Sequence, residues 1–390
     1  MRRLYRQWMH DWETRLADRD TNRVVRPFEW GLEWTQSWPL ADGQSSAADA
    51  ASFMRDLNRR IVEESDRFFS YTTPSDFRLE EDRLRFTSPV ATPYPENNVA
   101  LARWFPAAKY AKNGRKSSAE DPRAVVVLPQ WNADAESHVG LCRLFNWIGI
   151  SALRLSLPYH DVRKPAEIAR ADYAVSSNIA RTIDAARQAV IDARCCLDWL
   201  ENQGYRRLGI VGTSLGSCYA YLASAHDPRL RVNAFNHAST AFGDVVWAGQ
   251  STRHIRQALE DAGLTQERLR ALWSAISPVS YFERFRGPEA NGPGKNALVV
   301  YANYDLTFPR QYSLQVADAF RRSGLRHEVH MLPCGHYTTG ETPFKFLDGW
   351  YMGWFVYRAF KSLRDEKSAA LVKQSSLQDS KEAQLERTAP

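Results

Sequence analysis

The sequence is poor in cysteine and has neither a long uninterrupted apolar run nor a block of like charges. Its five cysteines are odd in number and irregularly spaced, with two adjacent, which does not suit a disulfide framework. We therefore expect reduced thiols and a cytoplasmic protein. Acidic and basic side chains recur soon after Met1, so we expect no secretory signal. The most apolar stretch, 346–360, is too short to span a bilayer and contains Asp348 and Arg358.

Charge and glycine patterns also exclude several classes of partner. The net charge is only +6 in 390 residues, and the basic residues are scattered, so we expect no nucleic-acid binding. This small excess leaves open a weak preference for anionic substrates or membrane surfaces, which no other feature indicates. The segment GIVGTSLG lacks the G-x-G-x-x-G spacing, and we expect no nucleotide and no other cofactor.

Apolar runs alternate with helical patterns along most of the chain. Such alternation is typical of an α/β fold, a mostly parallel sheet covered by helices on both faces. We expect a tryptophan-rich helical extension at 1–72, an α/β domain at 73–364 with a helical cap inserted at 242–285, and a disordered tail at 365–390. The expected strands are 77–79, 84–86, 99–105, 124–128, 151–157, 208–211, 232–235, 297–301 and 327–332.

The pentapeptide Gly-Thr-Ser-Leu-Gly at 212–216 follows an apolar strand and precedes a small-residue helix. In a strand–turn–helix context a G-x-S-x-G motif presents its serine at a sharp turn above the sheet. The two glycines suit positions where a Cβ would crowd the neighbouring strand and helix. We therefore interpret Ser214 as a nucleophile; the alternative is a glycine-rich turn that only packs.

A serine nucleophile needs a base and an orienting acid. Asp305 comes just after the strand at 297–301, and His336 just after the strand at 327–332. Chemistry gathers at the carboxyl ends of strands in such sheets, and the order Ser, Asp, His is the one expected for this motif. The alternatives are a turn aspartate and a surface histidine, with Asp244 as a rival acid.

Backbone N–H groups must also stabilise the oxyanion that forms during attack. Leu215, the residue after the nucleophile, would supply one. The loop after the strand at 124–128 would supply the second, from Trp131 or, as second choice, Gln130. His237 and His160 stand at strand ends and are candidate pocket residues, although turn capping is an equal alternative. Trp247 is the candidate from the inserted segment.

A second group of residues is a candidate metal site. His327 and His330, with Cys334 and His336, lie close in sequence. Positions three apart in a strand point to opposite faces, so the first two histidines do not easily share an ion. We expect no metal.

Together these motifs resemble the α/β-hydrolase superfamily over roughly residues 75–364. The 212–216 pentapeptide matches its nucleophile turn, Asp305 its acid loop and His336 its histidine loop. The segments 158–165 and 198–205 resemble the abhydrolase-domain-eighteen-like branch. Many superfamily members have His-Gly where this chain has Pro129-Gln130, and a non-glycine residue there limits the backbone conformation of the loop.

The sequence therefore predicts a serine hydrolase that cleaves a carboxylic ester, thioester or amide of a small-molecule acyl substrate. The resemblance does not distinguish water from another alcohol as acceptor, so an acyltransferase is an alternative. A non-catalytic binding protein is another, because a fold alone does not establish function. Acyl length and oligomeric state stay open.

Overall fold

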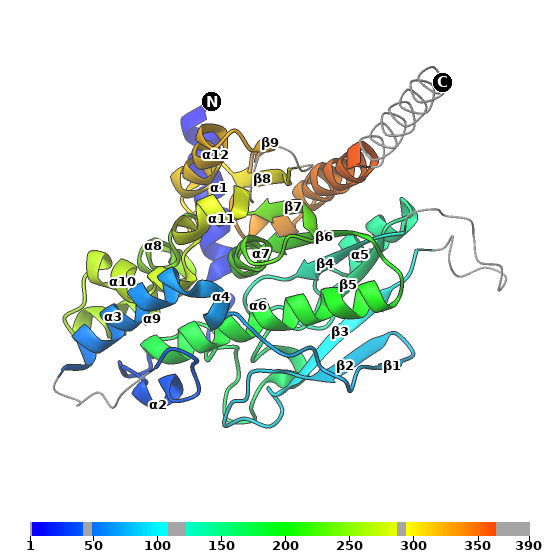
Figure 1. The fold of residues 1–390 in the computed structure, drawn as a ribbon. Coiled ribbons are helices and arrows are strands. Elements are labelled where there is room, and N and C mark those ends of the chain that lie inside the picture. The colour runs from blue at the N-terminus through cyan, green and yellow to red at the C-terminus, as the bar shows by residue number, and fades with distance from the viewer. Residues whose placement is uncertain (1, 42–48, 108–121, 287–293, 364–390) are drawn as a thin grey trace, which may run out of the picture.

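The computed structural model describes residues 2–41, 49–107, 122–286 and 294–363. The tail expected at 365–390 lies outside them. A nine-stranded sheet runs through the molecule in the order β1-β2-β3-β5-β4-β6-β7-β8-β9 (Figure 1). β1 to β3 are antiparallel, β3 pairs antiparallel with β5, and the remaining strands from β5 to β9 are parallel. The expected mostly parallel sheet is confirmed.

The strands lie where apolar runs predicted them. Their bounds are β1 (Arg78–Glu80), β2 (Arg83–Thr87), β3 (Val99–Phe105), β4 (Arg123–Leu128), β5 (Ser151–Leu155), β6 (Arg207–Thr213), β7 (Leu230–Asn236), β8 (Asn296–Ala302) and β9 (Arg326–Leu332).

Helices occupy the segments between the strands and before the sheet. The α-helices are α1 (Arg2–Ala17), α2 (Leu32–Thr35), α3 (Ala50–Glu63), α4 (Ser65–Phe68), α5 (Val139–Trp147), α6 (Ile179–Asn202), α7 (Leu215–Ala225), α8 (Phe242–Ala248), α9 (Arg253–Asp261), α10 (Gln266–Leu272), α11 (Phe282–Arg286) and α12 (Arg310–Arg322). Residues 344–363 are also helical. The 3₁₀ turns are η3 (Asp161–Arg163), η4 (Gln250–Thr252), η5 (Ser274–Ile276), η6 (Pro278–Tyr281) and η7 (Thr338–Gly340).

The two faces of the sheet have separate apolar cores. Alternate residues of β4 enter different cores because side chains alternate along a strand: Val126 belongs to one and Val127 to the other. The first core is formed with α6, α7, α12 and the inserted segment 242–285. The second is formed with α1, α5 and helix 344–363. Coverage on both faces explains why the central strands are continuous apolar runs.

Two local features differ from the sequence-based expectation. The helix expected from about 134 begins only at Val139, because Asp134 Oδ1 accepts hydrogen bonds from the N–H groups of Glu136 and Ser137 and holds a turn there. Helix α12 was not expected. Its buried Tyr312, Val316 and Phe320 recur every four residues, which is the helical signal that the sequence contains.

The N-terminal segment packs on the main domain through specific contacts. The Glu29 and Asn178 backbones form a parallel bridge, and Trp38 is buried with its indole N–H donating to Asp184 Oδ1 at 2.8 Å. The tryptophans do not all contribute to this docking. Trp8 on α1 is 48% exposed, and the buried face of that helix contains Met9 instead.

A fully buried ion pair connects α6 to two of the connecting segments. Arg163 Nη2 lies 2.8 Å from Asp192 Oδ2, and neither side chain is exposed. Ser88 Oγ donates to the other carboxylate oxygen at 2.7 Å. The guanidinium also donates to the carbonyl oxygens of Asn97 and Ser156. Removing one partner would leave the other buried with its charge uncompensated.

We therefore expect Asp192→Ala to lower the free energy of unfolding by about 3–5 kcal/mol. Asp56 is the control, since its ion pair with Arg59 lies on the exposed surface of α3. Asp56→Ala should change the free energy of unfolding by less than about 1 kcal/mol. Chemical denaturation of both variants measures the difference, and equal losses would contradict the role given to the buried pair.

Candidate active site

Ser214 occupies a sharp turn between β6 and α7. Its φ of 56° and ψ of −119° lie outside the regions that most non-glycine residues adopt. The turn closes only because its flanking residues are glycines. A Cβ on Gly212 would collide with the Gly216 backbone, and a Cβ on Gly216 would collide with the carbonyl groups of Leu128 and Pro129. The turn therefore holds the serine hydroxyl above the carboxyl end of the sheet.

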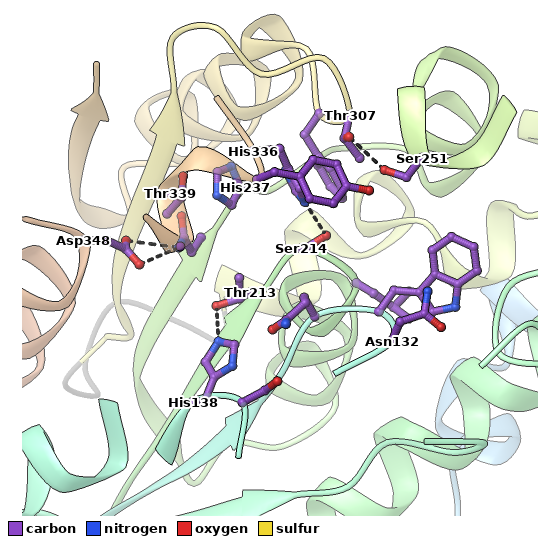
Figure 2. A pocket seen from close by; sticks show the side chains of 18 of the residues that line it. Asn132, His138, Thr213, Ser214, His237, Ser251, Thr307, His336, Thr339 and Asp348 are labelled. Atoms are coloured by element: carbon purple, nitrogen blue, oxygen red, sulfur yellow. Dashed lines mark hydrogen bonds between the residues drawn. The ribbon is translucent and has the colours of Figure 1, made fainter. Parts of the chain in front are cut away.

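The structure brings Ser214, His336 and Asp305 together in one hydrogen-bonded line. His336 Nε2 lies 3.1 Å from Ser214 Oγ, and His336 Nδ1 lies 2.9 Å from Asp305 Oδ2. Figure 2 shows the first of these contacts as a dashed line from the imidazole to the serine. Each residue follows a different strand, β6, β8 or β9, and β8 pairs in parallel with β9. An arrangement of this kind can move a proton from the hydroxyl to the ring.

Asp305 is held in place on both of its oxygens. Oδ1 accepts hydrogen bonds from the N–H groups of Thr307 at 2.8 Å and Phe308 at 2.6 Å. Oδ2 faces His336, and His237 Nδ1 also lies 2.9 Å from it without the alignment of a hydrogen bond. Phe308 stacks on the His336 ring with a centroid separation of 5.4 Å. The Asp305 carboxylate and the orientation of the His336 ring are therefore fixed by packing as well as by hydrogen bonds.

The electrostatics of the line favour a charged Asp305–His336 pair. Burial works against ionisation of Asp305. The interactions with His336, above all its charge, and with His237 outweigh burial and lower the pKa of the carboxyl. Burial also works against protonation of His336, but the charge and hydrogen bond of Asp305, with a contribution from Glu13, raise its pKa above 6.5. Burial and repulsion from His336 lower the pKa of His237, so this second ring stays neutral.

The loop after β4 presents free backbone amides beside the start of α7. Within the described residues, the N–H groups of Gln130, Trp131 and Leu215 have no hydrogen-bond acceptor. The next amide along, that of Asn132, is engaged, since it donates to His160 Nε2 at 3.0 Å. The carbonyl groups of Leu128 and Pro129 lie against Gly216, which places this loop directly over the helix start. The loop and the helix start are therefore in direct contact, and both carry amides without an acceptor among the described residues.

These groups open into one large cavity of about 1080 Å³. Its lining includes Ser214, His336, His237 and the amide-bearing residues Gln130, Trp131 and Leu215. Apolar side chains from the inserted segment form part of the wall, as do residues from α5 and helix 344–363. These apolar lining residues include Phe242, Val245, Val246, Leu141, Leu144, Phe346 and Met352.

Two residues expected at the pocket lie elsewhere. His160 is not part of the cavity lining; it is buried beneath the 130–132 loop, where its Nδ1 lies 2.8 Å from the Pro158 carbonyl oxygen. Burial lowers its pKa to about 4, so the neutral ring can accept the Asn132 N–H. Trp247 also lies outside the lining, and Arg256 stacks over its ring. Strand-end position and aromatic character were too general to distinguish pocket residues from loop supports.

The rival acid and the alternative metal cluster are not assembled. Asp244 pairs with Arg270 and accepts from Gln266 within the inserted segment. His330 stacks on Tyr351, 4.4 Å between centroids. Within the described residues, the group whose atoms lie close enough to hold a metal ion is His237, Asp305 and His336. Two of these three already form the line to Ser214.

Comparisons with known proteins agree with this fold. Residues 143–305 match the family model described as alpha/beta hydrolase domain containing 18. The acetyl xylan esterase 1 of Thermoanaerobacterium sp. JW/SL YS485 is 14% identical, with a TM-score of 0.53, and the match covers 84% of this chain and 99% of the esterase. This protein has the α/β-hydrolase fold. The expected α/β-hydrolase fold is confirmed, and the resemblance to the abhydrolase-domain-eighteen-like branch is confirmed over residues 143–305, which are less than half of the chain.

A second similar α/β-hydrolase structure is the acylaminoacyl peptidase of Pyrococcus horikoshii. It is 13% identical with a TM-score of 0.51. The match covers 72% of this chain but only 41% of the peptidase chain. The comparison with curated proteins found no match. Among the described residues there is no helix with the length and apolar character of a membrane span.

The sequence did not point to Glu13, a buried carboxylate that contacts the loop after His336. A weak signal exists in the sequence. Glu13 stands between Met9 and Leu16 on the apolar stripe of α1, where a charged residue is out of place.

The tight packing of the Ser214 turn makes a specific prediction about its second glycine. Gly216→Ala should lower the free energy of unfolding by about 1–3 kcal/mol or more, because the added methyl group meets backbone carbonyls that cannot swing away. Gly140, at the start of α5, has open space around the equivalent position. Gly140→Ala should be neutral or stabilising by up to about 1 kcal/mol. Thermal and chemical denaturation compare the two, and a well-tolerated Gly216→Ala would contradict this packing.

Proposed function

We propose that this protein is a serine hydrolase that cleaves carboxylic esters through an acyl-enzyme on Ser214. One observation supports this most strongly: Ser214 Oγ lies 3.1 Å from His336 Nε2, whose other nitrogen lies 2.9 Å from the buried Asp305. A protein that only bound ligands would not need this alignment. The esterase and peptidase that share the fold are consistent with the proposal.

In the proposed reaction, Ser214 Oγ attacks the carbonyl carbon of the ester while its proton passes to His336 Nε2. Asp305 holds the ring through Nδ1 and stabilises the imidazolium. The tetrahedral intermediate then expels the alcohol, which leaves with the proton from His336. Water, deprotonated by the same ring, releases the acid and regenerates the hydroxyl. With another alcohol in place of water, the same residues would transfer the acyl group.

The oxyanion donors of this proposal are the N–H groups of Leu215 and Trp131, with Gln130 as the alternative to Trp131. All three amides lack acceptors within the described residues, and an unpaired amide in a cavity is suited to a charge that appears only during reaction. Asn132 is unsuited, because its N–H already donates to His160. The Pro129-Gln130 sequence is therefore compatible with an oxyanion hole.

The proposed substrate carries a partly apolar acyl group. Phe242, Val245 and Val246 of α8 line the cavity near Ser214, as a cap over an acyl chain would. The expected cytoplasmic localisation stays a prediction.

A fluorophosphonate probe tests the nucleophile directly. We expect it to label the wild-type protein on Ser214 and to leave Ser214→Ala unlabelled, because the probe reacts only with an activated serine. Ser239 also lines the cavity, and Ser239→Ala should keep its labelling. Hydrolysis of a panel of p-nitrophenyl esters of increasing acyl length should be lost with Ser214→Ala alone. An unlabelled wild type, or equal labelling of Ser214→Ala, would sink the proposal.

The pH dependence of the reaction follows from the raised pKa of His336. The ring must be neutral to accept the serine proton, so kcat/KM should rise with pH, with a midpoint above 6.5. Asp305→Asn should lower kcat by about 10⁴-fold, as in other serine triads, and move the midpoint to lower pH.

Asp348 also titrates in this range, because burial raises its pKa to about 7, and it lines the same cavity. Asp348→Asn therefore separates the two groups. If His336 sets the pH profile, the midpoint stays in place in this variant. If Asp348→Asn instead abolishes the pH transition, Asp348 sets the profile and its assignment to His336 is wrong.

A further inference from the structure

Helix α1 directs one acidic side chain toward the back of the histidine loop. In Figure 1 this helix (blue) runs beside the β8 and β9 end of the sheet, and Tyr5 Oη donates to the Pro333 carbonyl oxygen at 2.6 Å. The buried stripe of α1 consists of Met9, Glu13, Leu16 and Ala17. Three of these four are apolar, as expected for a docked helix face. Glu13 is the exception, and none of it is exposed.

The Glu13 carboxylate binds the two residues that follow His336. Its Oε2 accepts the Tyr337 N–H at 2.9 Å and its Oε1 accepts the Thr338 N–H at 2.7 Å. These amides begin the turn η7 and have no acceptor within the turn itself. Each carboxylate oxygen thus fixes one peptide unit of the loop, and hydrogen bonds to a charged acceptor are the stronger kind.

The same side chain packs against the residue that precedes His336. A Cβ added to Gly335 would collide with the Glu13 side chain. The Gly335 N–H in turn donates to Thr338 Oγ1 at 2.8 Å, and that hydroxyl contacts Met9 Sδ. Helix α1 therefore contacts the loop on both sides of the histidine, and the position of the ring depends on a segment more than three hundred residues earlier in the chain.

Docking alone does not explain a carboxylate at this position. Within the described residues no lysine, arginine or histidine lies within ion-pair distance of Glu13. Burial accordingly raises its pKa, against the effect of the Thr338 hydrogen bonds. An apolar side chain would anchor the helix without that desolvation cost. What the carboxylate adds is a pair of acceptors for the loop and a negative charge that favours protonated His336.

We propose that Glu13 is a positioning residue of the active site: through the amides of Tyr337 and Thr338 it holds His336 in line with Ser214. This inference rests on the proposed function, because it assigns Glu13 a role in the same reaction. Glu13 does not touch the reacting atoms. It acts on the orientation and the basicity of the ring.

The test uses the full-length chain and p-nitrophenyl ester hydrolysis. Glu13→Gln keeps the size of the side chain but removes the charge and one of the two acceptors. It should lower kcat by about 10- to 100-fold with little change in KM, because misplacement of a reacting group by a fraction of an ångström costs rate more than binding. The acidic limb of kcat/KM should move to lower pH, since a negative charge near His336 is gone.

Two further variants separate the effect of the charge from the effect of side-chain length and position. Glu13→Asp keeps the charge on a side chain one methylene shorter, so it should lose kcat while its acidic limb stays closer to that of the wild type. Asp11 lies on the exposed face of the same helix. Asp11→Asn removes an equal charge without touching the loop. It should leave kcat, and kcat/KM along the acidic limb, within about twofold of the wild type.

Titration of competent sites with the fluorophosphonate distinguishes positioning from simple loss of folded protein. If the fall in kcat of Glu13→Gln equals the fall in titrated sites and the acidic limb does not move, Glu13 is only structural and the inference is wrong. It is equally wrong if Glu13→Gln behaves like Asp11→Asn. A wild type that the probe does not label fails the proposed function itself, which is a separate result.

A measurement on the wild type covers the case in which the Glu13 variants do not fold. Hydrogen–deuterium exchange of peptides covering 335–340 should be slow, because Glu13 accepts the Tyr337 and Thr338 amides. Fast exchange there, with slow exchange in the neighbouring strand β9, would overturn the inference without any variant.

Discussion

The hydrogen-bonded line from Asp305 through His336 to Ser214 constrains the rest of this structure. Its two contacts, 2.9 and 3.1 Å, join three loops, with Ser214 lying 122 residues and Asp305 31 residues before His336 in the chain. The line exists because β6, β7, β8 and β9 are neighbours in a parallel sheet, so that their carboxyl ends meet at one edge. Parallel strands need helical crossovers, which explains the helices on both faces and the two apolar cores.

Each member of the line is supported by contacts behind it. The Ser214 turn depends on two glycines packed against backbone, and the Asp305 loop on two amides that its own carboxylate accepts. His336 lies on the loop between β9 and η7. Its support comes from the stacked Phe308 and from Glu13 on α1. Side chains that must be positioned to within a fraction of an ångström require supporting contacts of this kind.

Two imidazoles, one in the site and one buried beside it, show how the same residue type takes different roles. His336 faces a carboxylate that favours its charged form, and its pKa is raised. His160 faces a backbone carbonyl and a backbone N–H, which suit a neutral ring, and its pKa is lowered to about 4. Both histidines follow strands in the sequence. Only the groups that tertiary packing places around them separate the ring that favours the charged form from the ring that supports a loop.

The fold and the three residues of the line could be predicted from the sequence, because each depends on short-range pattern. Buried parallel strands read as apolar runs, the Ser214 turn needs its two glycines, and Asp305 and His336 directly follow such runs. The delayed start of α5 depended on a side-chain turn at Asp134. His160 and Trp247 lie outside the cavity lining because of the direction in which the chain leaves the strand end and the packing of the inserted helices, which no local pattern records. The contact between Glu13 and the amides after His336 was decided only by the tertiary structure. It joins residues more than three hundred positions apart, and neither segment contains a local sequence pattern that identifies the other as its contact.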